Sequence, residues 1–168
     1  MNSALVLLEN GYDELELWVP YYRFLEHGLA AVLVGPKAGE TYAGKRGLPA
    51  RADLGFGEVD LADARIVLVP GGWAPDRIRV HEAAVELVRR ALDRGCVVAA
   101  ICHGGSVLVS ADIVRGRRVT STRSIRDDLR AAGATWVDEP VVVDGRLVTS
   151  RTPADLPRFL PAILAAAS

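Results

Sequence analysis

Residues 96–107 read CVVAAICHGGSV, an apolar run that ends abruptly at a cysteine, a histidine and two glycines. The run at 96–101 is too short for a free-standing helix and is apolar on both faces, which is typical of a buried parallel strand. Three further runs of this kind precede it, at 4–9 (ALVLLE), 30–36 (AAVLVGP) and 65–72 (RIVLVPGG). The pattern therefore predicts four buried parallel strands.

Helical segments separate these strands. Residues 13–28 and 81–95 both end at a glycine, as helices often do, although Pro20 should kink or shorten the first of them. We expect further helices at about 104–113 and after Pro153. Strands that alternate with helices predict an α/β fold, a doubly wound sheet with right-handed crossovers.

Two stretches depart from this alternation. Residues 37–57 are rich in glycine and polar residues, which suggests a small β-hairpin or excursion. Residues 135–150 place Asp144 and Gly145 between apolar segments, a pattern that predicts a hairpin with a type I′ turn. The sequence shows no repeat, linker or low-complexity tract, so we predict a single domain over residues 1–168.

Composition limits the classes of function. Of the 168 residues, 50% are hydrophobic and 24% are charged, and the net charge is −1, which gives no electrostatic support for a nucleic-acid or membrane partner. The two cysteines provide no disulfide framework. No apolar run approaches the roughly 20 residues of a membrane span. We expect a soluble protein in a reducing, cytoplasmic compartment.

Cys102 is the candidate nucleophile. It ends the 96–101 strand, and ligands of open α/β sheets bind beyond the carboxyl ends of the strands. A tight strand–turn–helix bend would project its thiol, with Gly104 and Gly105 leaving room, and the following helix is expected to lower the thiol pKa. A lone cysteine after an apolar run is otherwise an inert core residue. We assign that structural role to Cys96.

Candidate partners of the thiol lie in three places. His103 can act as a general acid–base or, alternatively, as a helix cap. Glu16 lies among apolar residues, so it either faces solvent or is buried with a raised pKa and hydrogen-bonds to the sulfur. The turn at Gly71 and Gly72 can offer N–H groups to an oxyanion, and Asp76 follows it; the alternative is an ordinary glycine turn with a helix-capping aspartate.

Four segments together resemble a known family. They are DELELWVPYYRFLEHG (13–28), VLVPGGWAPDRIR (67–79), VVAAICHGGSVLVSADIVRGR (97–117) and IRDDLRAAGATWVDEPVVVDGRLVTSRTPADL (125–156). They strongly resemble the intracellular protease I (PfpI) family, which belongs to the superfamily of the Parkinsonism-associated deglycase and the class I glutamine amidotransferase-like domains. The resemblance extends in order over essentially the whole chain.

The resemblance implies a flavodoxin-like three-layer sandwich with a mostly parallel central sheet. It implies Cys102 as nucleophile, His103 as its partner and Glu16 as a buried acid contacting the thiol. Gly72 and the backbone around His103 would form the oxyanion hole, with Gly71, Gly104 and Thr122 in the binding region. The triad acid, at the position of Asp76, would come from a neighbouring subunit of a homodimer or homohexamer.

Three positions differ from the family pattern. Asp76 replaces a glutamate, Gly105 replaces a proline, and Thr122 stands where an aromatic residue usually lines the pocket. Together they predict a wider or differently shaped pocket and leave the substrate open.

Two functions follow from the same cysteine. The first is a hydrolase or lyase of protease-like, deglycase or glyoxalase type, acting on a small reactive aldehyde or glycated group rather than a protein, because an interface pocket restricts access. The second is a redox-sensing stress-response protein or holdase without turnover. We predict no cofactor and no metal, since one Cys–His pair supplies too few ligands.

Overall fold

The four apolar runs form neighbouring parallel strands. In the computed structural model, which describes residues 2–168, they are β1 (Ser3–Leu7), β2 (Ala30–Gly35), β6 (Ala64–Val69) and β7 (Val97–Ile101). They lie within one seven-stranded sheet of order β10-β11-β7-β6-β1-β2-β5, in which β10 alone runs antiparallel to its neighbour. Nearly all side chains of β1, β6 and β7 are buried, which explains their continuous apolar character.

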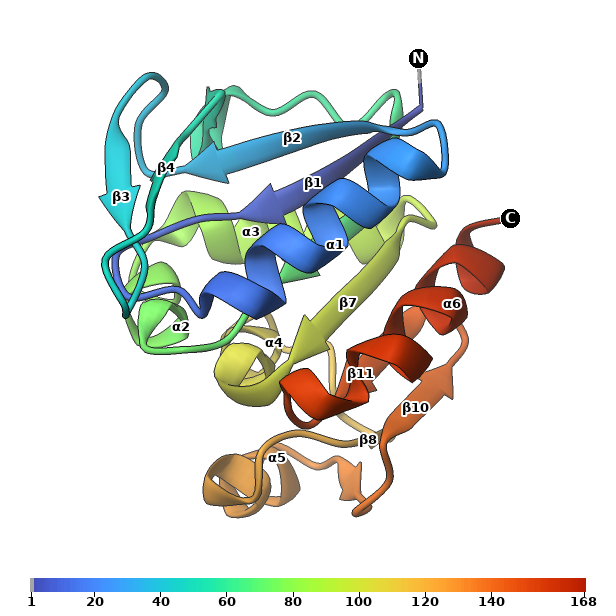
Figure 1. Cartoon of the computed structure of the whole chain (residues 1–168). Helices are drawn as coiled ribbons and strands as arrows, with labels where there is room; N and C mark the ends of the chain where they lie inside the picture. Colours follow the sequence, from blue (N-terminus) through green and yellow to red (C-terminus); the bar gives the residue numbers. More distant parts are fainter. Residues whose placement is uncertain (1) are drawn as a thin grey trace.

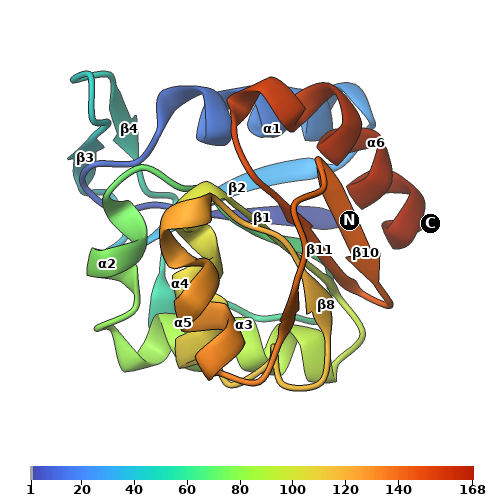
Figure 2. The ribbon, with the colours of Figure 1, turned by 90° about the horizontal axis from the view of Figure 1, so that it is seen from below.

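Helices cover both faces of this sheet (Figures 1 and 2). α1 and α6 pack on one face, and α3, α4 and α5 lie on the other, so the predicted three-layer α/β sandwich is confirmed. The α-helices of the described residues are α1 (Glu14–Glu26), α2 (Ala74–Ile78), α3 (Glu82–Asp93), α4 (Gly105–Ser110), α5 (Arg126–Ala131) and α6 (Leu156–Ala167). None of the described helices is long and apolar enough to cross a membrane.

Two helices differ from their predicted extents. α1 continues through Pro20 to Glu26, so the proline does not shorten it. Proline removes one backbone donor, and burial of Leu17 and Phe24 against the sheet compensates for that loss. α4 begins at Gly105, after the 3₁₀ turn Cys102–Gly104, and ends at Ser110, short of the predicted residue 113, because Asp112 adopts a positive φ of 54°.

The second hairpin is confirmed, but its turn type is not. β10 (Val141–Asp144) pairs with β11 (Leu147–Ser150), so the central turn residues are Gly145 and Arg146. Among residues 2–168 only Cys102 and Asp112 are non-glycine residues with positive φ, so a type I′ turn is excluded and Gly145, with φ 60°, fits type II′. The Asp144 carboxylate accepts the N–H of Arg118 at 2.8 Å, which keeps Asp144 in the strand.

The remaining short strands lie outside the predicted set or refine it. The excursion at 37–57 contains the antiparallel pair β3 (Thr41–Ala43) and β4 (Pro49–Arg51), followed by β5 (Leu54–Gly55) at the edge of the main sheet. β9 (Thr135–Trp136) pairs in parallel with β8 (Arg118–Val119) instead of joining the hairpin. The β3–β4 hairpin lies beside the start of α1 (Figure 1).

Candidate active site

Cys102 lies in a strained turn at the carboxyl edge of the sheet. It directly follows β7 and begins the 3₁₀ turn Cys102–Gly104, which leads into α4. Its φ is 60°, a left-handed conformation that costs an L-residue about 1 kcal/mol or more. The predicted tight strand–turn–helix bend at Cys102, the elbow, is therefore present.

Close packing explains two glycines of the site. A Cβ atom on Gly104 would lie 2.5 Å from the carbonyl oxygen of Val69, and one on Gly71 would lie 2.8 Å from the Cβ of Cys102. Neither distance is tolerated between real atoms, so the elbow can approach the end of β6 only with glycine at both positions. Gly105 is less demanding, since its Cβ would lie 3.2 Å from Ile125 Cδ1.

Four groups surround the sulfur. His103 Nδ1 lies 3.4 Å from Cys102 Sγ, and the buried Glu16 side chain, 1% exposed, is close enough to hydrogen-bond to it. The backbone N–H groups of His103 and Gly72 also point to the sulfur. The N–H of Gly71 does not, because it donates to Glu16 Oε2 at 2.7 Å. The backbone N–H groups next to the sulfur are thus those of Gly72 and His103.

The Glu16 carboxyl group gains and loses its proton near neutral pH. Burial and, after it, the negative charge of Asp13 raise the pKa of Glu16 to about 7, against the opposing effects of the Gly71 N–H, the Lys45 ammonium and the Cys102 thiol. The alternative that Glu16 faces solvent is excluded by its burial. The carboxyl group can therefore accept a proton from the thiol or donate one back at neutral pH.

The predicted lowering of the thiol pKa is wrong. Burial and, after it, the charge of Glu16 raise the pKa of Cys102 to about 11. The N–H groups of His103 and Gly72 offset only part of this rise. α4 is six residues long, so its dipole is too small to outweigh the loss of solvent. With this pKa, Cys102 is a protonated thiol at neutral pH.

Ser124 is a contact that the sequence did not reveal. Its Oγ lies 3.0 Å from His103 Nε2, on the side of the ring opposite the sulfur. The loop that carries it is held against the elbow by the N–H of Thr122, which donates to the Cys102 carbonyl at 3.4 Å. Within residues 2–168, Asp76 is exposed on α2 and makes no hydrogen bond to His103. Its role across a subunit interface stays a prediction.

A cavity opens beside Thr122. It has a volume of about 430 Å³ and is lined by Ser121, Thr122, Arg123, Asp138, Arg151 and Thr152. Arg151 is fixed there by Asp138 and Asp155, each at 2.9 Å. Thr122, whose N–H donates to the Cys102 carbonyl, links this cavity to the elbow, but Cys102, His103 and Glu16 do not line it.

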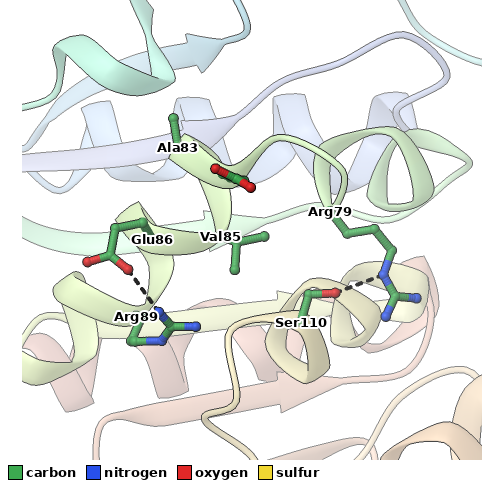
Figure 3. A pocket seen from close by; sticks show the side chains of 7 residues that line it. Arg79, Ala83, Val85, Glu86, Arg89 and Ser110 are labelled. Carbon is green, nitrogen blue, oxygen red and sulfur yellow. Dashed lines mark hydrogen bonds and ion pairs between the residues drawn. The ribbon is translucent and has the colours of Figure 1, made fainter.

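Other features lie away from the elbow. A pocket with a volume of about 590 Å³ lies between α3 and α4 (Figure 3). In it Arg79 donates to Ser110 and Arg89 pairs with Glu86, each at 2.9 Å. It holds none of the predicted site residues. No group of three His, Cys, Asp or Glu side chains within residues 2–168 is arranged to hold a metal ion. Cys96 is buried and forms no disulfide, in agreement with its assignment as a structural residue.

Known proteins resemble this chain along its whole length. A deglycase of Pyrococcus horikoshii is 43% identical, with 92% of each chain covered, and a putative cysteine protease of Bacillus subtilis is 37% identical, with 92% of this chain and 91% of that protein covered. A solved two-domain protein of Anabaena variabilis, with DJ-1/ThiJ/PfpI-like and ferritin-like domains, is 38% identical with a TM-score of 0.96. That match covers 98% of this chain and 48% of the two-domain protein.

The family assignment follows from the match over residues 2–166 together with these relatives. The elbow cysteine, the adjacent histidine and the buried glutamate form one constellation in the fold, at the positions that the resemblance predicts. The chain belongs to the DJ-1/PfpI family.

Proposed function

We propose that this protein is a cysteine-dependent enzyme that acts on small reactive aldehydes, or on glycated groups derived from them, with Cys102 as nucleophile. The observation that carries the proposal is the position of the Cys102 sulfur between two proton acceptors, Glu16 and His103, and two backbone donors. The names of the relatives, a deglycase and a putative cysteine protease, support enzymatic activity at a carbonyl centre.

The first step is addition to the carbonyl. Cys102 Sγ forms a bond to the aldehyde carbon while the thiol proton passes to the Glu16 carboxylate or to Nδ1 of a neutral His103. The carbonyl electron pair moves to oxygen, where the N–H groups of Gly72 and His103 stabilise the negative charge. Return of the proton to that oxygen gives a hemithioacetal.

The second step is specific to a 2-oxoaldehyde. A base removes the proton from the former aldehyde carbon, and a proton is delivered to the neighbouring carbonyl carbon. The hydroxyl proton on the first carbon moves to the oxygen of the second, which gives the Cys102 thioester of a 2-hydroxy acid. The first carbon is oxidised and the second is reduced, so no external oxidant or reductant is required. Water then attacks the thioester, and the hydroxy acid and the thiol are released.

The thiol pKa favours this chemistry over redox sensing. Peroxide oxidises the thiolate, and burial keeps Cys102 protonated at neutral pH in this site. A carbonyl substrate, in contrast, can be attacked as the proton moves to Glu16 or His103. The proposal includes a cytoplasmic homodimer or homohexamer, in which Asp76 of a neighbouring subunit would reach His103.

The test uses methylglyoxal as the probe and measures its loss and the formation of lactate. Cys102→Ser should lower the rate by at least about a hundredfold, because the sulfur nucleophile is lost. The matched control is Cys96→Ser, which alters the other cysteine and should retain the rate. Turnover that survives Cys102→Ser would overturn the nucleophile, and no turnover by the unaltered protein would overturn the substrate class.

A further inference from the structure

A lysine on the β3–β4 hairpin contacts the acidic cluster beside the elbow. Lys45 Nζ lies 2.7 Å from Asp13 Oδ2, and the Asp13 side chain is 3% exposed against 28% for the lysine. Such a buried carboxylate needs a counter-charge, because removal from water penalises its charged form. Lys45 is the nearest cation to it; Arg46 reaches the same oxygen only at 4.0 Å.

Asp13 connects this lysine to Glu16. Its Oδ1 atom caps α1 by accepting the N–H groups of Leu15 at 3.0 Å and Glu16 at 3.2 Å, while Oδ2 faces Lys45. Glu16 in turn accepts the Gly71 N–H at 2.7 Å and faces the Cys102 thiol. A continuous set of contacts thus leads from the hairpin to the sulfur.

The hairpin holds the lysine in place through its backbone. The N–H of Lys45 donates to the Tyr12 carbonyl at 2.9 Å, and the N–H of Arg46 donates to Glu14 Oε1 at 2.6 Å. Gly44 lies so close to the Glu14 carboxylate that a side chain there would overlap it. The position of Lys45 is therefore fixed by the fold at the start of α1.

We infer that Lys45 is a positioning residue: as the counter-ion of Asp13, it offsets the negative charge beside Glu16 and Cys102 and thereby makes the thiol easier to deprotonate. Its consequence for turnover rests on the proposed function, whereas its effect on the thiol does not. Nothing in the family resemblance or in the names of the relatives assigns this role to Lys45.

The charged groups around Glu16 and Cys102 have the signs that this inference requires. Glu16 is faced by Asp13 from α1, by Lys45 from the hairpin and by Cys102 from the elbow. The Lys45 charge lowers the pKa of Glu16, and the Asp13 charge raises the pKa of both Glu16 and Cys102. Without Lys45 only the more distant Arg46, at 4.0 Å, would oppose the negative charge of Asp13.

The experiment is the rate of Cys102 alkylation by iodoacetamide against pH, followed by mass spectrometry with Cys96 as internal reference. Lys45→Met should raise the midpoint by about half a unit to one unit, which is about three- to tenfold slower alkylation at a pH below the midpoint. Lys45→Arg should keep the original midpoint. The matched control is Lys37→Met, which removes a lysine that pairs with exposed Glu40 at 2.9 Å and should change nothing.

The direction of the shift separates positioning from simple loosening. If Lys45→Met only opened the site, water would reach Cys102 and the midpoint would fall, because desolvation is what raises it. A lowered or unchanged midpoint, or an equal shift in Lys37→Met, would overturn the inference. A shift as predicted in a protein that does not turn over methylglyoxal would refute the proposed function alone.

Discussion

Replacing Glu16 by glutamine should change how the stability of the protein depends on pH. The pKa of Glu16 is raised from 4.5 to about 7 in the folded state, chiefly by burial. Below pH 4.5 the group is protonated in both folded and unfolded states. Between pH 4.5 and 7 the folded state keeps a proton that the unfolded state has lost, so the contribution of Glu16 to stability falls as the pH rises.

The size of this effect follows from the shift. A rise from 4.5 to about 7 corresponds to about 3 kcal/mol of destabilisation above pH 7, where Glu16 is charged in both states. Glu16→Gln cannot ionise, and its side-chain oxygen can still accept the Gly71 N–H. The free energy of unfolding of the variant minus that of the original protein should therefore increase by about 3 kcal/mol between pH 4.5 and 8.

Urea unfolding at a series of pH values and one fixed protein concentration measures this difference. Taking the difference cancels the titration of the other carboxylates. Glu26→Gln on the same helix is the control, because Glu26 is 72% exposed in an ion pair with Arg23 and should give a nearly flat difference. If the difference in unfolding free energy for Glu16→Gln stayed constant or fell as the pH rose, the raised pKa of Glu16 would be refuted.

Three further outcomes are expected. Gly71→Ala places a methyl group 2.8 Å from the Cys102 Cβ and should lower stability by about 1–3 kcal/mol, whereas Gly57→Ala, with nothing within 4 Å, should not; thermal unfolding compares them. Cys102→Gly should be more stable than Cys102→Ala by up to about 1 kcal/mol in urea unfolding, because φ is 60°. Ser124→Ala removes the partner of the elbow histidine and should slow methylglyoxal turnover about fivefold at unchanged Tm.

The parts of the fold that could be predicted are those with a local signal. Each of the four parallel strands is a continuous apolar run, so its position could be deduced without knowing its neighbours. The turn at Gly145 could not be typed, because Asp144 is held in its strand by a bond to Arg118, which is distant in sequence. Ser124 has no periodic or motif signal, and only the folded loop brings it to His103.

The direction of the thiol pKa is the clearest case of a property that no local pattern contains. A helix that begins after a cysteine predicts a thiolate. Here the helix has fewer than two turns, and the sulfur is buried away from water. Burial raises the pKa of both Glu16 and Cys102, so the sulfur keeps its proton near neutral pH. Under the proposed function, the thiolate would form only as the sulfur adds to a bound carbonyl. Lys45, more than fifty residues before the cysteine, comes near this pair only in the folded chain, where it pairs with Asp13 and lowers the pKa of Glu16.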